Sequence, residues 1–203
     1  MIEEKTVEIF EDHSEFFSNL YAGGGWGEVS SGGGSSVENT VQYREFLENF
    51  IKENKIKKVY DFGCGDWTFS QLIDWSGVNY VGIEVVESLV EKLQKYKKTN
   101  VKFYYVKNPK SFYGKKGDLL LLKDILQHWN NEEITTFLDK VSPNFKYIII
   151  TNSSAQQKDW EDIQGRFGGR PLSCKYYPLK KYNIKIVLNF SDKEISLIQN
   201  TEL

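Results

Sequence analysis

The chain has 203 residues, 40% of them hydrophobic and 27% charged, which is close to the usage of globular proteins and too short for two ordinary domains. The net charge of −2 gives no electrostatic footprint for nucleic acid, and no apolar run approaches the roughly 20 residues that cross a bilayer. Two cysteines and two histidines exclude a disulfide framework and a four-cysteine zinc site. The acidic start Ile2–Lys5 differs from a signal peptide. We therefore expect a cytoplasmic protein with no metal and with no nucleic-acid or membrane partner.

Residues 1–20 have the apolar spacing of an amphipathic helix, and a segment rich in glycine and serine follows at 22–36. This segment is either a flexible linker or a lid over a site. A linker usually separates two domains, whereas only one helix lies upstream here. We therefore favour the lid, with Trp26 near the substrate. The lid belongs to a single domain, 1–203, whose Rossmann-like core is expected at 37–203.

The remainder of the chain alternates helical segments with short apolar runs. Helical segments are predicted over 36–53, 70–74, 87–96 and 132–140, and strands over 58–62, 78–83, 101–106, 118–122 and 146–151. The last two strands, 182–190 and 194–199, are separated by three residues, which indicates a β-hairpin. Five strand–helix units followed by a hairpin predict an α/β fold with a mostly parallel sheet that ends in an antiparallel pair.

The first predicted strand ends in Asp61 and runs into the turn Gly63-Cys64-Gly65. Glycine lets a backbone approach a ligand closely, and ligands of open α/β sheets bind beyond the carboxyl ends of the strands. A carboxylate at Asp61 suits a cationic or amino-bearing ligand, because it would repel a pyrophosphate. A Gly-x-Gly turn alone is also typical of purely structural turns.

A second acid, Glu84, ends the next predicted strand, nineteen residues after Gly65. A carboxylate at this position can accept both hydroxyl hydrogens of a ribose. The alternative for Glu84 is an ordinary exposed acid, and its place at the strand end favours the functional role.

The run Asp61–Asp66 followed by Gly82–Glu84 closely resembles the first two motifs of class I S-adenosylmethionine-dependent methyltransferases. The order of elements over 37–203 is also similar to that family's seven-stranded sheet. The resemblance implies S-adenosylmethionine as cofactor and S-adenosylhomocysteine as product. It implies that Gly63 and Gly65 pass under the cofactor, that Asp61 lies near its amino-acid end and that Glu84 binds its ribose. Cys64 and Val85 are also expected to contact the cofactor.

Two positions depart from the family's pattern. Trp67 stands where many members carry a third glycine, so either the loop is tighter there or the indole packs against the cofactor. Asn108 follows the third strand, where many members place an aspartate that reaches the adenine amine. An asparagine can accept the same hydrogen bond more weakly.

The segment after the fourth strand resembles the fourth motif of a bacterial subgroup of these enzymes. It implies that Lys123 and Asp124 contact the cofactor and that Trp129 contacts the substrate. His128 is the predicted catalytic residue. It can accept the acceptor's proton, because its ordinary pKa lies near neutrality. Its alternative role is a histidine that shapes the pocket.

Three arginines are further candidates. Arg44, in an upstream segment that resembles the same subgroup more loosely, could pair with the methionine carboxylate. Arg166 and Arg170 flank a glycine pair after the fifth strand and could clamp an anionic substrate. For each arginine, an ordinary surface position is the alternative.

The resemblance predicts methyl transfer to a small metabolite or sugar, with an anionic acceptor as one option and O-methylation in bacterial surface-polysaccharide synthesis as the leading hypothesis. An RNA or protein methyltransferase is one alternative. A non-catalytic protein that binds S-adenosylmethionine and regulates a partner is another. The expected partner is a small-molecule acceptor, and assembly into a homodimer stays open.

Overall fold

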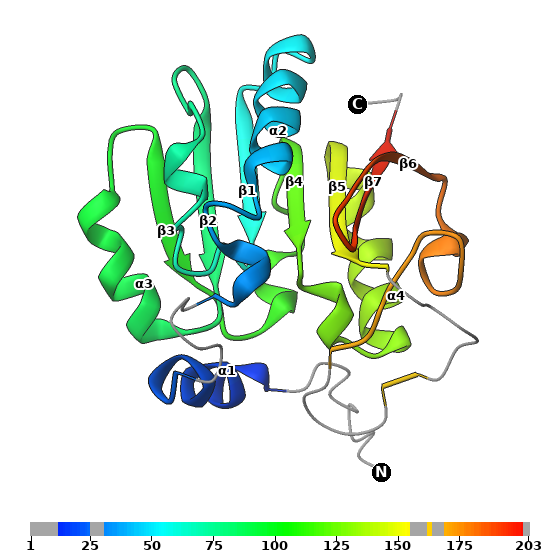
Figure 1. Ribbon diagram of the computed structural model, residues 1–203, viewed down its shortest axis with the longest axis horizontal. Coiled ribbons are helices and arrows are strands. Elements are labelled where there is room, and N and C mark those ends of the chain that lie inside the picture. Colours follow the sequence, from blue (N-terminus) through cyan, green and yellow to red (C-terminus); the bar gives the residue numbers. More distant parts are fainter. Residues whose placement is uncertain (1–11, 25–30, 155–161, 164–168, 201–203) are drawn as a thin grey trace, which may run out of the picture.

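The computed structural model describes residues 12–24, 31–154, 162–163 and 169–200. Its strands form one seven-stranded sheet in the order β3-β2-β1-β4-β5-β7-β6 (Figure 1). The strands are β1 Lys58–Phe62, β2 Asn79–Glu84, β3 Val101–Tyr105, β4 Gly117–Lys123, β5 Phe145–Ser153, β6 Ile184–Phe190 and β7 Lys193–Gln199.

The first five strands run parallel, and β7 is antiparallel to both of its neighbours, β5 and β6. All seven predicted strands are present, and the closing hairpin is confirmed. The order reverses between β1 and β4, because the chain first builds outward to β3 and then returns to the other side of β1. Ligands of such sheets bind at this switch point.

The described α-helices are α1 His13–Ala22, α2 Val41–Glu53, α3 Glu87–Leu93 and α4 Asn131–Val141. The prediction over 36–53 is wrong at its start. Residues 36–40 form a turn in which the Thr40 hydroxyl donates to the Ser36 carbonyl oxygen at 2.7 Å, and α2 begins only after it.

Two other predicted helices are only partly present among the described residues. Residues 70–74 contain a short 3₁₀ turn rather than an α-helix, so the first strand–helix unit has no full helix. The helix predicted over 1–20 is described only from His13 onward, and residues 1–11 lie outside the described part of the chain.

Two hydrophobic clusters form the core, one on each face of the sheet. On one face, α2 places Tyr43, Leu47 and Ile51 against the strands, and on the other α4 contributes a second apolar set. Along β4 the side chains alternate between these clusters: Leu119 and Leu121 join the first, and Leu120 and Leu122 the second. This burial on both sides explains why β4 reads as an unbroken apolar run.

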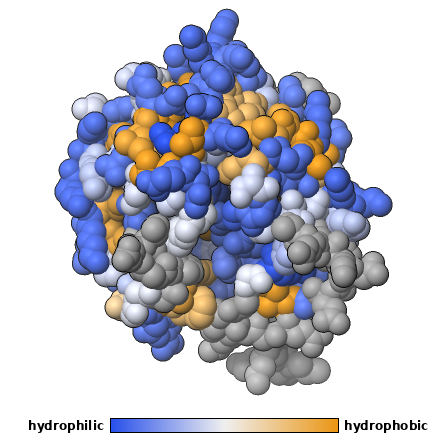
Figure 2. All heavy atoms as spheres, viewed as in Figure 1, coloured by the Kyte–Doolittle hydropathy of each residue, from blue (hydrophilic) through white to orange (hydrophobic). Residues whose placement is uncertain are grey.

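The face of the molecule in Figure 2 is largely hydrophilic, with apolar atoms in separate groups. Among the described residues, no helix combines the length and the apolar character that crossing a membrane requires.

Candidate active site

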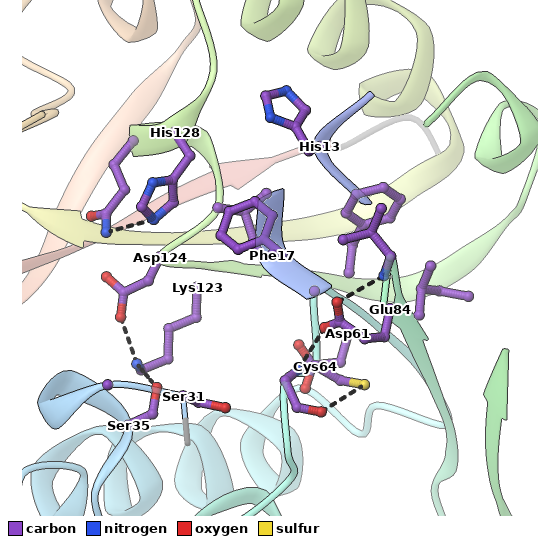
Figure 3. A pocket seen from close by; sticks show the side chains of 18 of the residues that line it. His13, Phe17, Ser31, Ser35, Asp61, Cys64, Glu84, Lys123, Asp124 and His128 are labelled. Carbon is purple, nitrogen blue, oxygen red and sulfur yellow. Dashed lines mark hydrogen bonds and ion pairs between the residues drawn. The ribbon is translucent and has the colours of Figure 1, made fainter. Parts of the chain in front are cut away.

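A cavity of about 340 Å³ opens at the edge of the sheet where the parallel strands end. In Figure 1, α1 lies across this edge. The walls come from α1, from residues 31–35, from the loops after β1, β2 and β3, from the segment after β4, and from the start of β7. Figure 3 shows side chains from these separate parts of the chain converging on one space.

The turn after β1 forms the floor of the cavity. Gly63 and Gly65 adopt φ angles of 78° and 59°, a region that favours glycine. A Cβ on Gly63 would overlap Cδ1 of Ile125, and a Cβ on Gly65 would lie 2.8 Å from the Ser31 hydroxyl oxygen. The structure therefore gives a reason for both glycines, and Cys64 between them also lines the cavity.

We expect Gly65→Ala to lower the free energy of unfolding by about 1–2 kcal/mol, because alanine is strained at a left-handed φ, and to weaken ligand binding as well. Gly77→Ala is the matched control, since Gly77 also has a positive φ, 73°, but a Cβ there meets nothing within 4 Å. Urea denaturation and calorimetric titration with S-adenosylhomocysteine give both readouts. Equal ligand affinity in the two variants would contradict a role of Gly65 in the site.

Glu84 is buried at the end of β2 and is held by backbone donors. Its Oε2 accepts a hydrogen bond from the Gly65 N–H at 2.9 Å, and its Oε1 accepts from those of Val85 at 2.8 Å and Val86 at 3.2 Å. Burial raises the pKa of Glu84, and the three backbone donors oppose that rise. A carboxylate has about four acceptor positions, so a position on Oε2 remains for a ligand. Val85 also lines the cavity.

Asp61 lies on the same wall, at the end of β1. The Tyr80 hydroxyl donates to its Oδ2 at 2.6 Å. Burial raises the pKa of Asp61 to about 6, although the Tyr80 hydrogen bond and the nearby Lys123 ammonium both lower it. Asp61 thus lies at the switch point as a buried acid.

An ion-pair cluster occupies the wall beyond β4. Lys123 Nζ lies 2.7 Å from Asp124 Oδ2 and donates to the Gly34 carbonyl oxygen at 2.9 Å. Asp124 has a positive φ of 58°, which turns the chain sharply at the strand end. Its other oxygen, Oδ1, lies 2.6 Å from Lys193 Nζ. Lys193, the first residue of β7, was missed from the sequence, because nothing local shows that the hairpin returns to this edge.

His128, the predicted catalytic residue, and Trp129, the predicted substrate contact, both line the cavity. Phe17 of α1 presents an edge-to-face contact to the His128 ring, with centroids 5.4 Å apart. His13 stacks on Trp129 at 6.5 Å, and its Nε2 lies 3.3 Å from Glu133 Oε1.

The N-terminal part of the wall also contains residues that the sequence analysis did not assign to the site. These are His13, Phe17, Tyr21 and Ser31. The Ser31 hydroxyl oxygen accepts from the Asp66 N–H at 3.0 Å and lies 2.9 Å from the Tyr21 hydroxyl. These contacts hold Ser31, in the described part of the glycine- and serine-rich segment, against the loop after β1.

Trp67, predicted to contact the cofactor, faces away from the cavity. Its φ of 61° is one that glycine adopts easily, which fits the glycine that many family members carry there. The indole is buried on the far side of the loop, with its ring 5.1 Å from Phe103 and 5.3 Å from Tyr96. Packing in the core thus replaces the proposed contact with the cofactor.

Two other predicted cofactor contacts are also absent from the cavity wall. Asn108 caps a short 3₁₀ turn, and its Oδ1 accepts from the Lys110 N–H at 2.9 Å. Arg44 donates from Nη2 to the Val37 carbonyl oxygen at 3.1 Å and so braces the turn before α2. Local backbone partners hold both side chains in place.

Arg170 is not among the residues that line the cavity either. Its Nη2 donates to the Trp129 carbonyl oxygen at 3.2 Å and to Asn131 Oδ1 at 2.7 Å, and its Nη1 lies 3.5 Å from Asp162 Oδ1. In this arrangement Arg170 supports the segment after β4 instead of clamping a substrate. The predictions for Trp26 and Arg166 lie outside the described residues.

No family model and no curated protein sequence match this chain. Solved structures do. One is the magnesium protoporphyrin IX methyltransferase ChlM from Synechocystis PCC 6803, solved with bound S-adenosylmethionine, with a TM-score of 0.60, 14% identity and coverage of 95% of this chain and 98% of that one. Another is the methyltransferase domain of bacterial CtHen1, with a TM-score of 0.60, 14% identity and coverage of 81% and 100%.

A third neighbour is the bifunctional kinase-methyltransferase WbdD, with a TM-score of 0.59, 12% identity and coverage of 86% of this chain and 43% of that one. The chain therefore spans less than half the length of WbdD. At these identities the likeness shows the fold: a Rossmann-like α/β sheet of the class I methyltransferase type, as the sequence predicts.

Proposed function

We propose that this chain is a cytoplasmic methyltransferase that uses S-adenosylmethionine. The observation that carries the proposal is the placement of Glu84. Its carboxylate is buried, fixed by three backbone N–H groups, and set on the cavity wall beside the glycine turn. A fixed acceptor at the end of β2 suits the hydroxyls of a ribose.

The cofactor assignment has independent support. ChlM was solved with S-adenosylmethionine, and the N-terminal domain of EvdMO1, another neighbour with a TM-score of 0.54 at 12% identity, was solved with S-adenosylhomocysteine. In this chain Asp61 would face the amino group, and Gly63 and Gly65 would leave room for the ligand to lie against the backbone. When bound, the cofactor supplies an electrophilic methyl group on a sulfonium.

The chain's own residues would align the acceptor and remove its proton. An acceptor oxygen forms a bond to the methyl carbon as the carbon–sulfur bond breaks, so the sulfonium charge is lost and the acceptor proton must leave. His128, on the wall beyond β4, is the residue proposed to take that proton. Alignment of the reacting atoms contributes most of the acceleration, so the proton acceptor has a secondary role.

We further propose O-methylation of a small metabolite or sugar in surface-polysaccharide synthesis. A cavity of about 340 Å³ is within the size range of small-molecule sites. The net charge of −2 disfavours an RNA substrate.

Calorimetric titration with S-adenosylhomocysteine tests the cofactor assignment, and absence of binding would refute the whole proposal. Incubation with S-adenosylmethionine carrying a labelled methyl group, across a panel of neutral and acidic sugars, then tests catalysis. Binding without transfer to any member of the panel would favour a non-catalytic regulatory protein.

We expect His128→Ala to leave the affinity for S-adenosylhomocysteine unchanged and to lower turnover about 100-fold, at the low end for a general base, since alignment remains when the proton acceptor is lost. His128→Gln keeps a polar side chain of similar reach and separates proton transfer from packing against Phe17. Turnover of both variants equal to that of the unmodified protein would make His128 structural.

A further inference from the structure

Two lysines, Lys123 at the end of β4 and Lys193 at the start of β7, lie on the cavity wall. Asp124 presents one carboxylate oxygen to each of two ammonium groups, Lys123 Nζ at 2.7 Å and Lys193 Nζ at 2.6 Å. Lys123 also lies near Asp61, whose pKa it lowers, so Lys123 is shared by two carboxylates. Among the described residues Lys193 has Asp124 alone as its ion-pair partner, and Asp124 is itself shared with Lys123.

The two lysines differ in how their N–H donors are used. Lys123 has an acceptor for each of its three donors: Asp124, the Gly34 carbonyl oxygen at 2.9 Å and the Ser35 hydroxyl oxygen at 3.4 Å. Within the described part of the chain, Lys193 donates only to Asp124. An ammonium group has three donors, so two donors of Lys193 remain for a ligand.

Lys193 is also well placed to meet a ligand. Its side chain is only 12% exposed, yet the residue lines the cavity. Because β7 is antiparallel to β5, its first residue pairs with Ser153, the last residue of β5, at the edge where the parallel strands end. A cation held mostly out of water gains more from a bound anion than an exposed lysine does.

The charges of the cavity are segregated along the sheet. Glu84 and Asp61 lie at the ends of β2 and β1, whereas Lys193 lies further along the sheet, at the start of β7. The acidic side suits the ribose and the amino group of the proposed cofactor. The basic side is left for the second substrate.

We propose that Lys193 binds a carboxylate or phosphate group of the methyl acceptor, which is therefore an acidic or phosphorylated small molecule. The anion site stands on the contacts of Lys193, while its assignment to the acceptor rests on the proposed function. This site would do what the sequence analysis proposed for Arg170, whereas Arg166 lies outside the described residues.

Equilibrium dialysis against radiolabelled inorganic phosphate tests the site, with the full chain alone and saturated with S-adenosylhomocysteine. We expect saturable binding in both states, a loss of at least tenfold in affinity for Lys193→Met, and affinity within about threefold for Lys193→Arg, which keeps the charge. Lys185→Met, an exposed lysine of β6 outside the cavity, is the matched control and should bind phosphate normally. Lys193→Gln provides a second neutral variant in case Lys193→Met does not fold.

Absence of saturable binding, or equal binding by Lys193→Met and the unmodified protein, would overturn the anion site. Competition between phosphate and S-adenosylhomocysteine would assign the site to the carboxylate of the cofactor and overturn its assignment to the acceptor. If S-adenosylhomocysteine does not bind at all, the proposed function fails, whereas phosphate binding that depends on Lys193 would still support the anion site.

Discussion

Replacing Glu84 by alanine is expected to weaken binding of S-adenosylhomocysteine by about 1–3 kcal/mol, which is a factor of about 5 to 150 in the dissociation constant. The reason is that the ribose hydroxyls lose their buried charged acceptor. The backbone N–H groups of Gly65 and Val85 lose theirs as well, so the turn that carries the ligand also loosens. Calorimetry well below the unfolding temperature measures the affinity of the folded protein.

The matched control is Glu87→Ala, three residues further along the chain. Glu87 is exposed in the first turn of α3 and does not line the cavity, so its removal changes the net charge equally without touching the site. We expect its affinity to stay within about twofold, because surface charges far from a ligand contribute little. An equal loss in both variants would indicate a general charge effect.

A change in the ligand separates loss of the ribose contact from loosening of the loop. The unmodified protein should prefer 5′-methylthioadenosine over its 2′,3′-dideoxy analogue, and Glu84→Ala should lose most of that preference. If the variant keeps the full preference, Glu84 does not recognise the ribose. The proposed function would then lose the observation that carries it.

The sequence predicted the sheet well because each strand has a local signal. Leu119–Leu122 is an apolar run bounded by polar residues, and the last two strands are separated by a short polar turn. The start of α2 was harder to predict. Serine is a common residue at helix N-termini, but in the structure the Ser36 carbonyl oxygen accepts from the Thr40 hydroxyl in a separate turn. That choice depends on hydrogen bonds of the folded turn, which composition does not reveal.

The candidate site could be predicted only where the motif and the sheet edge coincide, as at Gly63 and Glu84. Lys193 and His13 reach the cavity from opposite ends of the chain, and no local pattern indicates their destination. Trp67 was predicted at the right loop and on the wrong side of it, because a positive φ redirects the side chain. The sequence thus could not predict which distant segments pack together at the cavity, nor the backbone angle of a single residue.

Replacing Asp61 by asparagine is expected to stabilise the protein and to weaken its ligand binding. Burial raises the pKa of Asp61 from 3.8 to about 6. The unfolded chain therefore releases this proton at a lower pH than the folded chain does. Keeping Asp61 ionised in the folded protein costs about 3 kcal/mol above pH 6, at 1.36 kcal/mol for each tenfold change.

The sign of the pH dependence follows from that difference. Below pH 3.8 the group is protonated in both states, so it carries no such cost. Between pH 3.8 and about 6 the folded state binds more protons than the unfolded state, and stability falls as the pH rises. Asparagine does not ionise, so the advantage of Asp61→Asn should be small at pH 4, grow up to pH 6 and then stay constant.

At pH 8 we expect a gain of about 1–3 kcal/mol in the free energy of unfolding. The gain does not exceed the ionisation cost of about 3 kcal/mol, which already includes the favourable hydrogen bond from the Tyr80 hydroxyl to the carboxylate, 2.6 Å long in the structure. Urea titrations at pH 4, 6 and 8 measure the change. Glu91→Gln, on the exposed side of α3, is the control for removing one negative charge.

Ligand binding should change in the opposite direction. If Asp61 faces the amino group of S-adenosylhomocysteine, Asp61→Asn should weaken binding above pH 6, and the affinity of the unmodified protein should itself fall as the pH drops through about 6. A buried acid that destabilises the fold is expected where function requires its charge. A variant that is more stable and binds as tightly at pH 8 would show that this charge has no role in the site.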